Sequence, residues 1–374
     1  SFDGTMRIWS TEVSTELMRF EYNGPVTTVV FSPDGTKLVG SSNTQARVWD
    51  VPTNRELLRF YHDNWVNTVA FSPDGNKLAT AGFDNTARIW DVNTGRELQW
   101  LKHADSVNAL AFSPDGSKLA TASRDHFAKI WNANTGQLLH KLLHNDSINS
   151  LVFSPNCSRL ATASDDGKAC IWDPMSGMLL MQLLHNGAVK AIDFSPNGRI
   201  LATASYDKMA RIWNAVDGRL LQLMEHDRPV LEVAFSPDQK NLVTISDDNT
   251  SRIWKIEIGT NLQLQRLEHD NSVLAVAFSP DGRKLATASA DTTARLWASD
   301  FNNNTTNFGL LSKDDLIKGA CSRVTQNMTR EEWSRFIEDP DSDCLTCPAE
   351  GRLNKSSIWS WESRECQPCI GNFG

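Results

Sequence analysis

Residues 66–90, VNTVAFSPDGNKLATAGFDNTARIW, decide the fold, because close copies of this stretch follow one another through most of the chain. An alternating apolar run leads into a Ser-Pro-Asp-Gly turn, a second apolar run, an Asp-centred turn and a third run that ends in Trp. Short apolar runs separated by turn residues are typical of antiparallel strands joined by tight hairpins. The stretch therefore predicts a three-stranded meander.

The copies recur at a fixed period, and such a period outweighs local propensity as a guide to architecture. The final Trp returns about every 41 residues, at Trp9, Trp49, Trp90, Trp131, Trp172, Trp213, Trp254 and Trp297. A turn and a fourth short apolar run, such as residues 97–101, follow most of these positions. Four-stranded sheets with two apolar faces must stack face to face, so the repeats predict an all-β, seven-bladed propeller of antiparallel blades.

The period, the turn chemistry and the Arg-Ile-Trp-Asp ending of residues 1–298 resemble the WD-repeat family of β-propellers. The resemblance implies a hydrogen-bonded tetrad of His, Thr, Asp and Trp in each blade. Six units carry these residue types at matching offsets. The implied structural tetrads are His62, Thr80, Asp84, Trp90; His103, Thr121, Asp125, Trp131; His144, Thr162, Asp166, Trp172; His185, Thr203, Asp207, Trp213; His226, Thr244, Asp248, Trp254; and His269, Thr287, Asp291, Trp297.

The first complete unit departs from this pattern. Tyr22 stands in the His position and Gly40 in the Thr position, and the turn at residues 42–44 has no Asp. We expect this blade to have the weakest cross-bracing.

A His held by an Asp beside a hydroxyl is also the layout of a nucleophilic triad. Six equivalent copies argue against an active site, and each hydroxyl belongs to a Thr inside a strand. We therefore expect the tetrads to tie the turns of each blade together, and the protein to be non-catalytic.

Ring closure depends on the two ends of the repeat region. The last unit ends at Trp297 and is followed by a polar, Asn-rich segment where a fourth strand is due. The run at residues 16–20 resembles such a strand, so we expect it to close a seven-bladed propeller of residues 11–300. Residues 1–10 are then a remnant of a preceding repeat. An eight-bladed ring is the alternative, for which residues 1–23 supply two strands.

Recognition residues are expected where the units differ, because the scaffold repeats and a site does not. The resemblance places variable positions of each unit around the central channel at one end of the propeller. Aromatic and Arg side chains are common at interface hot spots. The predicted partner-binding residues are Trp65, Asn67, Phe83, Asn108, Arg124, Asp165, Lys190, Tyr206, Leu231 and Asp247. The alternative is that these positions vary because nothing constrains them, against which the large aromatic Trp65 argues.

The period changes after an Asn-rich linker at residues 301–311. Apolar residues then recur every four positions, and a capping box follows, which predicts a helical pair at residues 312–339. This segment resembles the tail that closes WD-repeat arrays in large bacterial, notably cyanobacterial, proteins. There the array often follows a signalling NTPase of the STAND class or a protease-like or kinase effector.

A Cys-rich tail forms residues 340–374, with two Cys-x-x-Cys pairs at Cys344, Cys347, Cys366 and Cys369. Two such pairs can hold one Zn²⁺ in a tetrahedral four-thiolate site. The resembling tails carry Cys at the positions of Cys321 and Cys347 without the second pair, so a disulfide or buried thiols are the alternatives. We expect no cofactor for the propeller itself.

Composition and charge narrow the function. The composition is that of a globular protein, and a formal net charge of -8 argues against nucleic acid and anionic membranes as partners. No apolar run reaches the ~20 residues that span a bilayer, and we expect a cytoplasmic location. The chain enters the repeat in its middle, which favours the C-terminal part of a longer protein.

These features together predict a non-catalytic protein-recognition platform. We expect it to be the C-terminal sensor or regulatory array of a larger bacterial signalling or defence protein, which binds a protein partner or preceding domains of the same chain. The alternative is a structural scaffold subunit of a stable multiprotein assembly.

Overall fold

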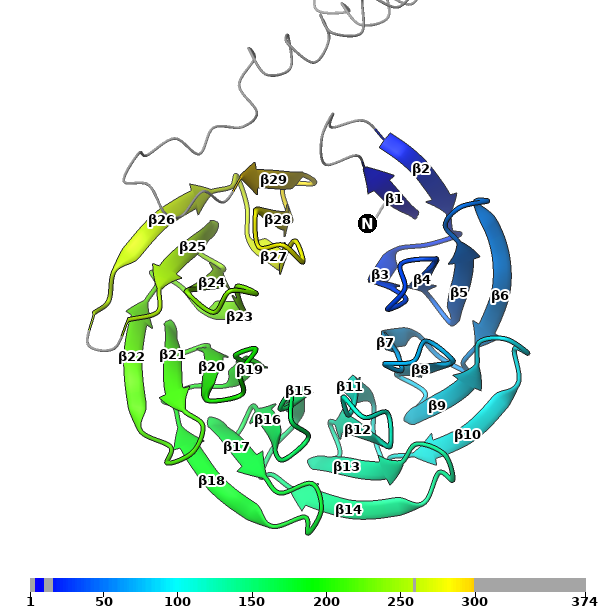
Figure 1. The fold of residues 1–374 in the computed structure, drawn as a ribbon, viewed down its shortest axis with the longest axis horizontal. Coiled ribbons are helices and arrows are strands. Elements are labelled where there is room, and N and C mark those ends of the chain that lie inside the picture. Colours follow the sequence, from blue (N-terminus) through cyan, green and yellow to red (C-terminus); the bar gives the residue numbers. More distant parts are fainter. Residues whose placement is uncertain (1–3, 10–15, 258–259, 299–374) are drawn as a thin grey trace, which may run out of the picture. The chain divides into compact units, whose positions relative to one another are not determined.

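The computed structural model describes residues 4–9, 16–257 and 260–298, and these residues form 29 β-strands (Figure 1). In every sheet the strands form an antiparallel meander and pair with their neighbours in sequence. The sheets follow one another around a central axis in sequence order, with the first strand of each four-stranded sheet innermost (Figure 1). The predicted all-β propeller of antiparallel blades is confirmed. Within the described residues, no helix is long and apolar enough to cross a membrane.

Within the same residues, six blades have four strands, a seventh has three, and one sheet has two. The four-stranded blades are β3 (Val26–Phe31), β4 (Lys37–Ser42), β5 (Gln45–Asp50), β6 (Arg55–Tyr61); β7 (Val66–Phe71), β8 (Lys77–Gly82), β9 (Thr86–Asp91), β10 (Glu97–Lys102); β11 (Val107–Phe112), β12 (Lys118–Ser123), β13 (Phe127–Asn132), β14 (Leu138–Leu143); β15 (Ile148–Phe153), β16 (Leu160–Ser164), β17 (Lys168–Trp172), β18 (Leu179–Leu184); β19 (Val189–Phe194), β20 (Ile200–Ser205), β21 (Met209–Asn214), β22 (Leu220–Glu225); and β23 (Val230–Phe235), β24 (Asn241–Ser246), β25 (Thr250–Lys255), β26 (Gln263–Glu268). The three-stranded blade is β27 (Val273–Phe278), β28 (Lys284–Ser289), β29 (Ala294–Ala298), and the two-stranded sheet is β1 (Thr5–Trp9), β2 (Glu16–Glu21).

The Ser-Pro-Asp-Gly sequence forms the turn between the two inner strands of a blade, as between β7 and β8. Gly75 adopts a φ of 71°, in the left-handed region that favours glycine. The Ser72 hydroxyl donates to Asp74 Oδ1 at 2.5 Å and accepts the Lys77 amide at 2.9 Å. This local chemistry fixes the hairpin and thereby the register of the inner strands.

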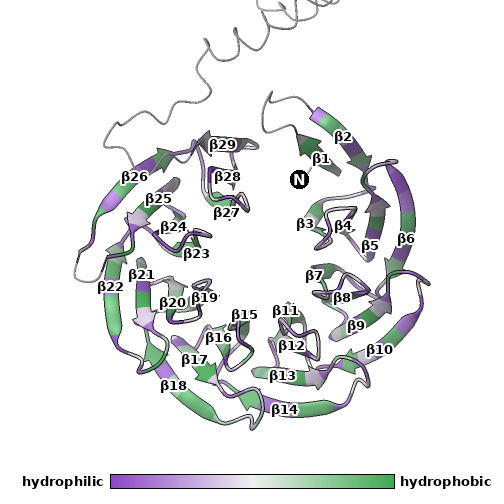
Figure 2. Cartoon of the chain, in the orientation of Figure 1, coloured by the Kyte–Doolittle hydropathy of each residue, from purple (hydrophilic) through white to green (hydrophobic). Residues whose placement is uncertain are grey.

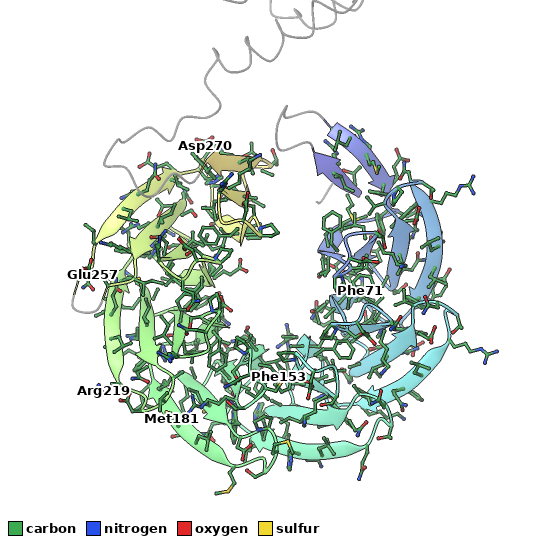
Figure 3. All side chains as sticks on the ribbon, in the orientation of Figure 1. Phe71, Phe153, Met181, Arg219, Glu257 and Asp270 are labelled. Atoms are coloured by element: carbon green, nitrogen blue, oxygen red, sulfur yellow. The ribbon has the colours of Figure 1, made fainter. Side chains whose placement is uncertain are left out.

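The apolar core lies between successive blades. In the β11–β14 blade, Ala120 and Ala128 are fully buried against Ile148 and Phe153 of the next blade. Small side chains on one blade let the larger side chains of the next approach closely, and the same division recurs between other blades. Figure 2 shows apolar stretches along the strands, and Figure 3 shows the side chains that they carry, with Phe71 and Phe153 labelled on innermost strands.

The predicted closure by residues 16–20 is corrected by the structure. β2 pairs with β1, so that Phe20 lies opposite Met6, and the β27–β29 blade stays three-stranded. Residues 5–9, predicted to be surplus, form β1. The physical reason is chain connectivity: only residues 10–15 separate β1 from β2, so this hairpin loses less chain entropy than a pairing with β29 at the far end of the repeats.

The incomplete β1–β2 sheet leaves part of its neighbour uncovered. Met6 and Phe20 are buried against the β3–β6 blade. Phe31 on β3 is nevertheless 49% exposed, whereas the equivalent Phe71 on β7 is 8% exposed. The two strands of β1–β2 therefore cover only a part of the blade face that a four-stranded sheet covers elsewhere.

The predicted linker, helical pair and Cys-rich tail, residues 301–374, lie outside the described residues.

Candidate functional site

The tetrads join the turns and strands of each blade through side-chain hydrogen bonds. In the β11–β14 blade, Asp125 Oδ2 lies 2.9 Å from His103 Nδ1, and His103 Nε2 lies 2.7 Å from Thr121 Oγ1. Thr121 Oγ1 also accepts the indole N–H of Trp131 at 2.9 Å. Because a carboxylate only accepts, Nδ1 carries the ring proton and Nε2 accepts the Thr hydroxyl. Both ring nitrogens and the hydroxyl are satisfied.

The same bonds recur in four other predicted tetrads. These are His62, Thr80, Asp84, Trp90; His144, Thr162, Asp166, Trp172; His226, Thr244, Asp248, Trp254; and His269, Thr287, Asp291, Trp297.

The tetrad of the β19–β22 blade differs from the predicted pattern. The Thr203 hydroxyl keeps its bonds to His185 Nε2 and to the indole of Trp213. His185 Nδ1, however, lies 3.1 Å from the Leu183 carbonyl, and Asp207 is held by a guanidinium nitrogen of Arg211 at 2.7 Å.

Burial and hydrogen bonding have opposite effects on the pKa values of the tetrad Asp and His. Burial alone would raise the pKa of Asp125, but hydrogen bonds from His103 and from the Ala104 amide hold that pKa well below its usual range. Burial lowers the pKa of His103, and the nearby carboxylate opposes this only in part. At neutral pH the carboxylate is therefore charged and the imidazole neutral, which is the state that the hydrogen bonds require.

The tetrad hydroxyls are closed to substrates. Thr80 and Thr121 are fully buried inside their strands, whereas a nucleophile must be reachable by the group it attacks. The tetrads act as cross-braces.

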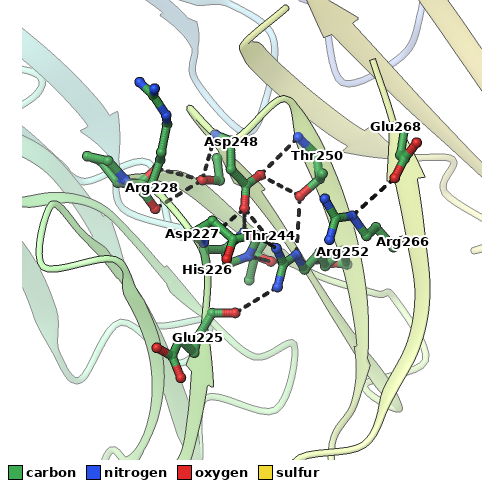
Figure 4. A network of polar contacts seen from close by, with 12 residues as sticks. Glu225, His226, Asp227, Arg228, Thr244, Asp248, Thr250, Arg252, Arg266 and Glu268 are labelled. Carbon is green, nitrogen blue, oxygen red and sulfur yellow. Dashed lines mark hydrogen bonds and ion pairs between the residues drawn. The ribbon is translucent and has the colours of Figure 1, made fainter. Parts of the chain in front are cut away.

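A fifth side chain, which sequence reasoning did not identify, joins most tetrads. Arg252 is only 8% exposed, and its Nη2 lies 2.9 Å from both Asp248 Oδ2 and Asp227 Oδ2 (Figure 4). Its Nη1 donates to the Glu225 carbonyl at 3.0 Å. Cations at the same place in other blades are Arg88, Lys129, Arg211 and Arg295. The repeated spacing of four residues from Asp to cation was the signal that could have revealed this contact.

The β3–β6 blade has a different brace. Trp49 Nε1 donates to Tyr22 Oη at 3.0 Å, and the Tyr22 hydroxyl donates to the Gly40 carbonyl at 3.3 Å. A Cβ at Gly40 would collide with the Tyr22 hydroxyl, so the missing side chain makes room for the phenol. Burial raises the pKa of Tyr22 to about 12, and the phenol keeps its proton. The two departures from the pattern therefore form one contact.

The turns that contain the tetrad Asp and the loops before the innermost strands, such as residues 83–85 and 62–65, lie together at what we call the tetrad end. The Phe83 amide ties these two segments with a 2.8 Å bond to the Trp65 carbonyl. The predicted partner-binding residues lie on these turns and loops or at the start of innermost strands, namely Trp65, Asn67, Phe83, Asn108, Arg124, Asp165, Lys190, Tyr206, Leu231 and Asp247.

Three of these ten side chains contact the backbone or the apolar core of the next blade. Asn67 Nδ2 donates to the Val107 carbonyl at 3.4 Å, and Asn108 Nδ2 donates to the Ile148 carbonyl at 2.9 Å. Leu231 packs against the core shared with the β27–β29 blade. Sequence reasoning missed this structural role, although Asn at the same place in three consecutive units is itself a repetition.

Three further residues contact one another. Lys190 Nζ lies 2.6 Å from Asp165 Oδ1 and 4.7 Å from the centre of the Tyr206 ring. Tyr206 is 48% exposed. The lysine charge is therefore neutralised within the chain, and the tyrosine ring remains open to solvent.

Asp247 lies in a polar pocket between the β23–β26 and β27–β29 blades. The pocket has a volume of about 550 Å³ and is lined by Asp227, Arg228, Asn271 and Ser272 as well. Ser272 donates its hydroxyl to Asp247 Oδ1.

Arg124 and Phe83 contact one another at the tetrad end, and Trp65 lies on the loop that is tied to the Phe83 turn. Trp65 is 47% exposed, and Arg124 is also exposed. Arg124 belongs to the next blade along the chain after that of Phe83, and its Cζ lies 5.3 Å from the centre of the Phe83 ring.

Two carboxylates on innermost strands escaped sequence reasoning. Asp193 Oδ2 accepts the Phe235 amide at 3.1 Å, and Glu232 Oε2 accepts the Val276 amide at 3.2 Å. Burial raises the pKa of Asp193 to about 6 and that of Glu232 to about 7. Both stand where other units have small or uncharged residues, and this departure was a usable signal.

The structure describes no group of three or more His, Cys, Asp or Glu that could hold a metal ion within residues 4–9, 16–257 and 260–298. The predicted zinc ligands, Cys344, Cys347, Cys366 and Cys369, lie outside these ranges, and zinc binding stays a prediction.

Family comparisons agree with the repeat geometry. The model of the WD domain, G-beta repeat, matches four consecutive units at residues 136–173, 178–214, 218–255 and 261–298. This chain contains WD40 repeats. A second family model, eukaryotic translation initiation factor eIF2A, matches residues 4–147. WD40 propellers are typically non-catalytic platforms for protein interaction, and neither match indicates an enzyme family.

Among solved structures, the crystal structure of the computationally designed Ika8 protein is similar to this WD40 propeller. Its TM-score is 0.71 at 25% sequence identity, over 80% of this chain and 92% of that chain. No curated protein matches the chain.

Proposed function

We propose that this WD40 propeller is a non-catalytic platform that binds a protein partner through its tetrad end. The observation that carries the proposal is the exposure of large aromatic side chains there: Trp65 and Tyr206 are each about half exposed on turns that the tetrads brace. A rigid support lowers the entropy lost when an aromatic side chain is buried in an interface.

We further propose that the propeller is the C-terminal sensor or regulatory array of a larger bacterial signalling or defence protein. Support comes from the resemblance of the segment after the repeats to the tails of such arrays. The coding sequence upstream of Ser1 tests this: an NTPase, protease-like or kinase domain is the expected finding, and a gene that begins with the propeller would overturn it.

Partner capture by the wild-type chain and by a Trp65→Ala, Phe83→Ala double variant tests the tetrad end. The matched control is Met175→Ala, Met178→Ala, because these two exposed apolar residues lie in the connection between β17 and β18, at the opposite end of a blade. Partners are captured from lysate, identified by mass spectrometry and then purified.

Loss of the purified partner from the Trp65, Phe83 variant alone is the expected result. Equal recovery with all variants would instead favour a different surface or the role of a structural scaffold subunit. Thermal unfolding of each variant checks that the propeller is intact.

A further inference from the structure

We infer that Trp65, Phe83 and Arg124 form a binding site for a peptide segment that carries a side-chain or terminal carboxylate next to an apolar residue. This inference rests on the proposed function, because it names the chemistry of the partner at the tetrad end.

The backbone holds the three side chains in place. The Phe83 amide donates to the Trp65 carbonyl at 2.8 Å, and the Arg124 amide donates to the Ser106 carbonyl at 2.9 Å. The Trp65 amide is itself bound by Asn64 Oδ1 at 2.8 Å. Each turn is thus tied to the neighbouring loop, and the two aromatic side chains and the guanidinium project from a fixed frame.

The contact of Lys190 with Tyr206 resembles that of Arg124 with Phe83, but among the described residues only the first includes a carboxylate. Lys190 lies over Tyr206 at 4.7 Å, and a carboxylate of the same chain, Asp165, reaches its ammonium at 2.6 Å. Arg124 lies over Phe83 in the same manner, at 5.3 Å. Within the part of the chain that the structure describes, no carboxylate pairs with the Arg124 guanidinium. A carboxylate that pairs with Arg124 in the same way would come from another molecule.

The guanidinium favours a carboxylate of a peptide. Its planar fork of N–H groups matches a carboxylate in a bidentate manner. Trp65, half exposed on the loop whose carbonyl accepts the Phe83 amide, offers a surface for an apolar side chain.

The surroundings disfavour a dianionic group. Asp105 is exposed on the loop that is tied to the Arg124 turn, and its negative charge opposes a phosphate more strongly than a single carboxylate. Arg124 alone has to neutralise the ligand charge. We therefore choose an acidic peptide over a phosphopeptide as the occupant.

Selection from a random peptide library displayed on phage tests the inference with the complete chain as bait. Selected peptides should share an Asp, a Glu or a free C-terminal carboxylate within two positions of Leu, Ile, Met or Phe. Synthetic copies, measured by fluorescence polarisation, should bind Arg124→Gln and Trp65→Ala at least tenfold more weakly than wild type. Replacing the peptide carboxylate by an amide should produce a similar loss.

Lys102→Gln is the matched control, because Lys102 is an exposed cation at 4.1 Å from the ring of Trp100 on the outer strand β10. Its affinity for the peptides should be unchanged. Arg124→Lys should lie between wild type and Arg124→Gln, since the charge remains without the fork.

Several outcomes would overturn the inference. Peptides without acidic residues, affinities unaffected by Arg124→Gln, or tighter binding of phosphorylated peptides than of their Glu counterparts would each contradict it while leaving a recognition platform intact. Failure to select any binding peptide would count against the platform as well.

Discussion

The β3–β6 and β7–β10 blades solve the same packing problem with different side chains. In β7–β10, the Trp90 indole donates to Thr80, whose hydroxyl also meets His62. In β3–β6, the Trp49 indole donates directly to Tyr22. The phenol replaces the imidazole and the hydroxyl together, which requires that position 40 has no side chain.

This difference shows what the scaffold demands: a satisfied indole and a link between the second strand and the loop before the first. It does not demand a particular residue. The brace in the β3–β6 blade joins fewer groups. In β7–β10, Asp84 also binds His62 and the Asp63 amide, whereas the turn at residues 42–44 has no such carboxylate.

Thr80→Ala should have the largest effect on stability. It leaves His62 Nε2 and the Trp90 N–H without partners in a buried site, and we expect a loss of about 3 kcal/mol in the free energy of unfolding. Urea denaturation followed by Trp fluorescence measures the loss. Tyr22→Phe is the counterpart in β3–β6 and should lose about 1 kcal/mol, because it removes the bond of the half-buried Trp49 and the 3.3 Å bond to the Gly40 carbonyl. Equal losses would contradict the comparison.

Gly40→Thr tests the coupling of the two departures in β3–β6. The added side chain collides with the Tyr22 hydroxyl, and we expect a loss of about 2 kcal/mol. Tyr22→His in the same chain should recover part of this loss, since His and Thr then form the pair seen in the other blades. A double-mutant cycle measures the recovery, and strictly additive losses would show that the two positions are independent.

The local parts of this architecture were readable from the sequence. The strands and their hairpins followed from alternation and from Ser-Pro-Asp-Gly turns, because these signals act within a few residues. The tetrads followed from the family resemblance and its regular offsets. The structure forms five of the six as implied, whereas in the sixth Asp207 pairs with Arg211 and not with His185. Even the departures at Tyr22 and Gly40 were visible, although their mutual dependence appears only when the phenol is seen against the Gly40 backbone.

Contacts between units were not readable in the same way. The carboxylates that pair with Arg252 lie outside β25, at Asp248 in the preceding turn and at Asp227 in the loop after β22. The stacking of Arg124 on Phe83 joins residues one full repeat apart. The pairing of β2 with β1 depends on competition between two partners, which a pattern of apolar residues cannot rank.

The stability of the β11–β14 blade should fall at low pH, whereas that of the β3–β6 blade should not. The folded pKa of His103 lies below its ordinary 6.5, so as pH falls below that value the unfolded chain binds a proton that the folded blade refuses. The β11–β14 blade should lose protection progressively below about pH 6.5. The β3–β6 blade, with Tyr22 in place of His, should not lose protection in this window.

Hydrogen exchange resolved by blade measures this, after correction for the intrinsic exchange rate. Blade resolution matters because Asp193 and Glu232 act oppositely: their folded pKa values are raised, so their contribution to stability declines as pH rises through about 6 and about 7. Asp193→Asn, Glu232→Gln removes that opposing contribution. Parallel loss of protection in both blades would contradict the assignment of the effect to His103.

Ser251→Ala should have a small effect, and it is the only substitution expected to stabilise. Among the described residues, Ser251 Oγ is buried without a hydrogen-bond partner, whereas the equivalent residues of the two compared blades are Ala46 and Ala87. Removing the unsatisfied hydroxyl should raise the free energy of unfolding by about 1 kcal/mol. Ser246→Ala on the adjacent strand is the control: its hydroxyl donates to the Pro229 carbonyl at 2.8 Å and accepts the Asp248 amide at 3.1 Å, so this substitution should destabilise. If both substitutions destabilise in urea denaturation, the Ser251 hydroxyl has a partner, and the third strand of the β23–β26 blade departs from its counterparts for a structural reason.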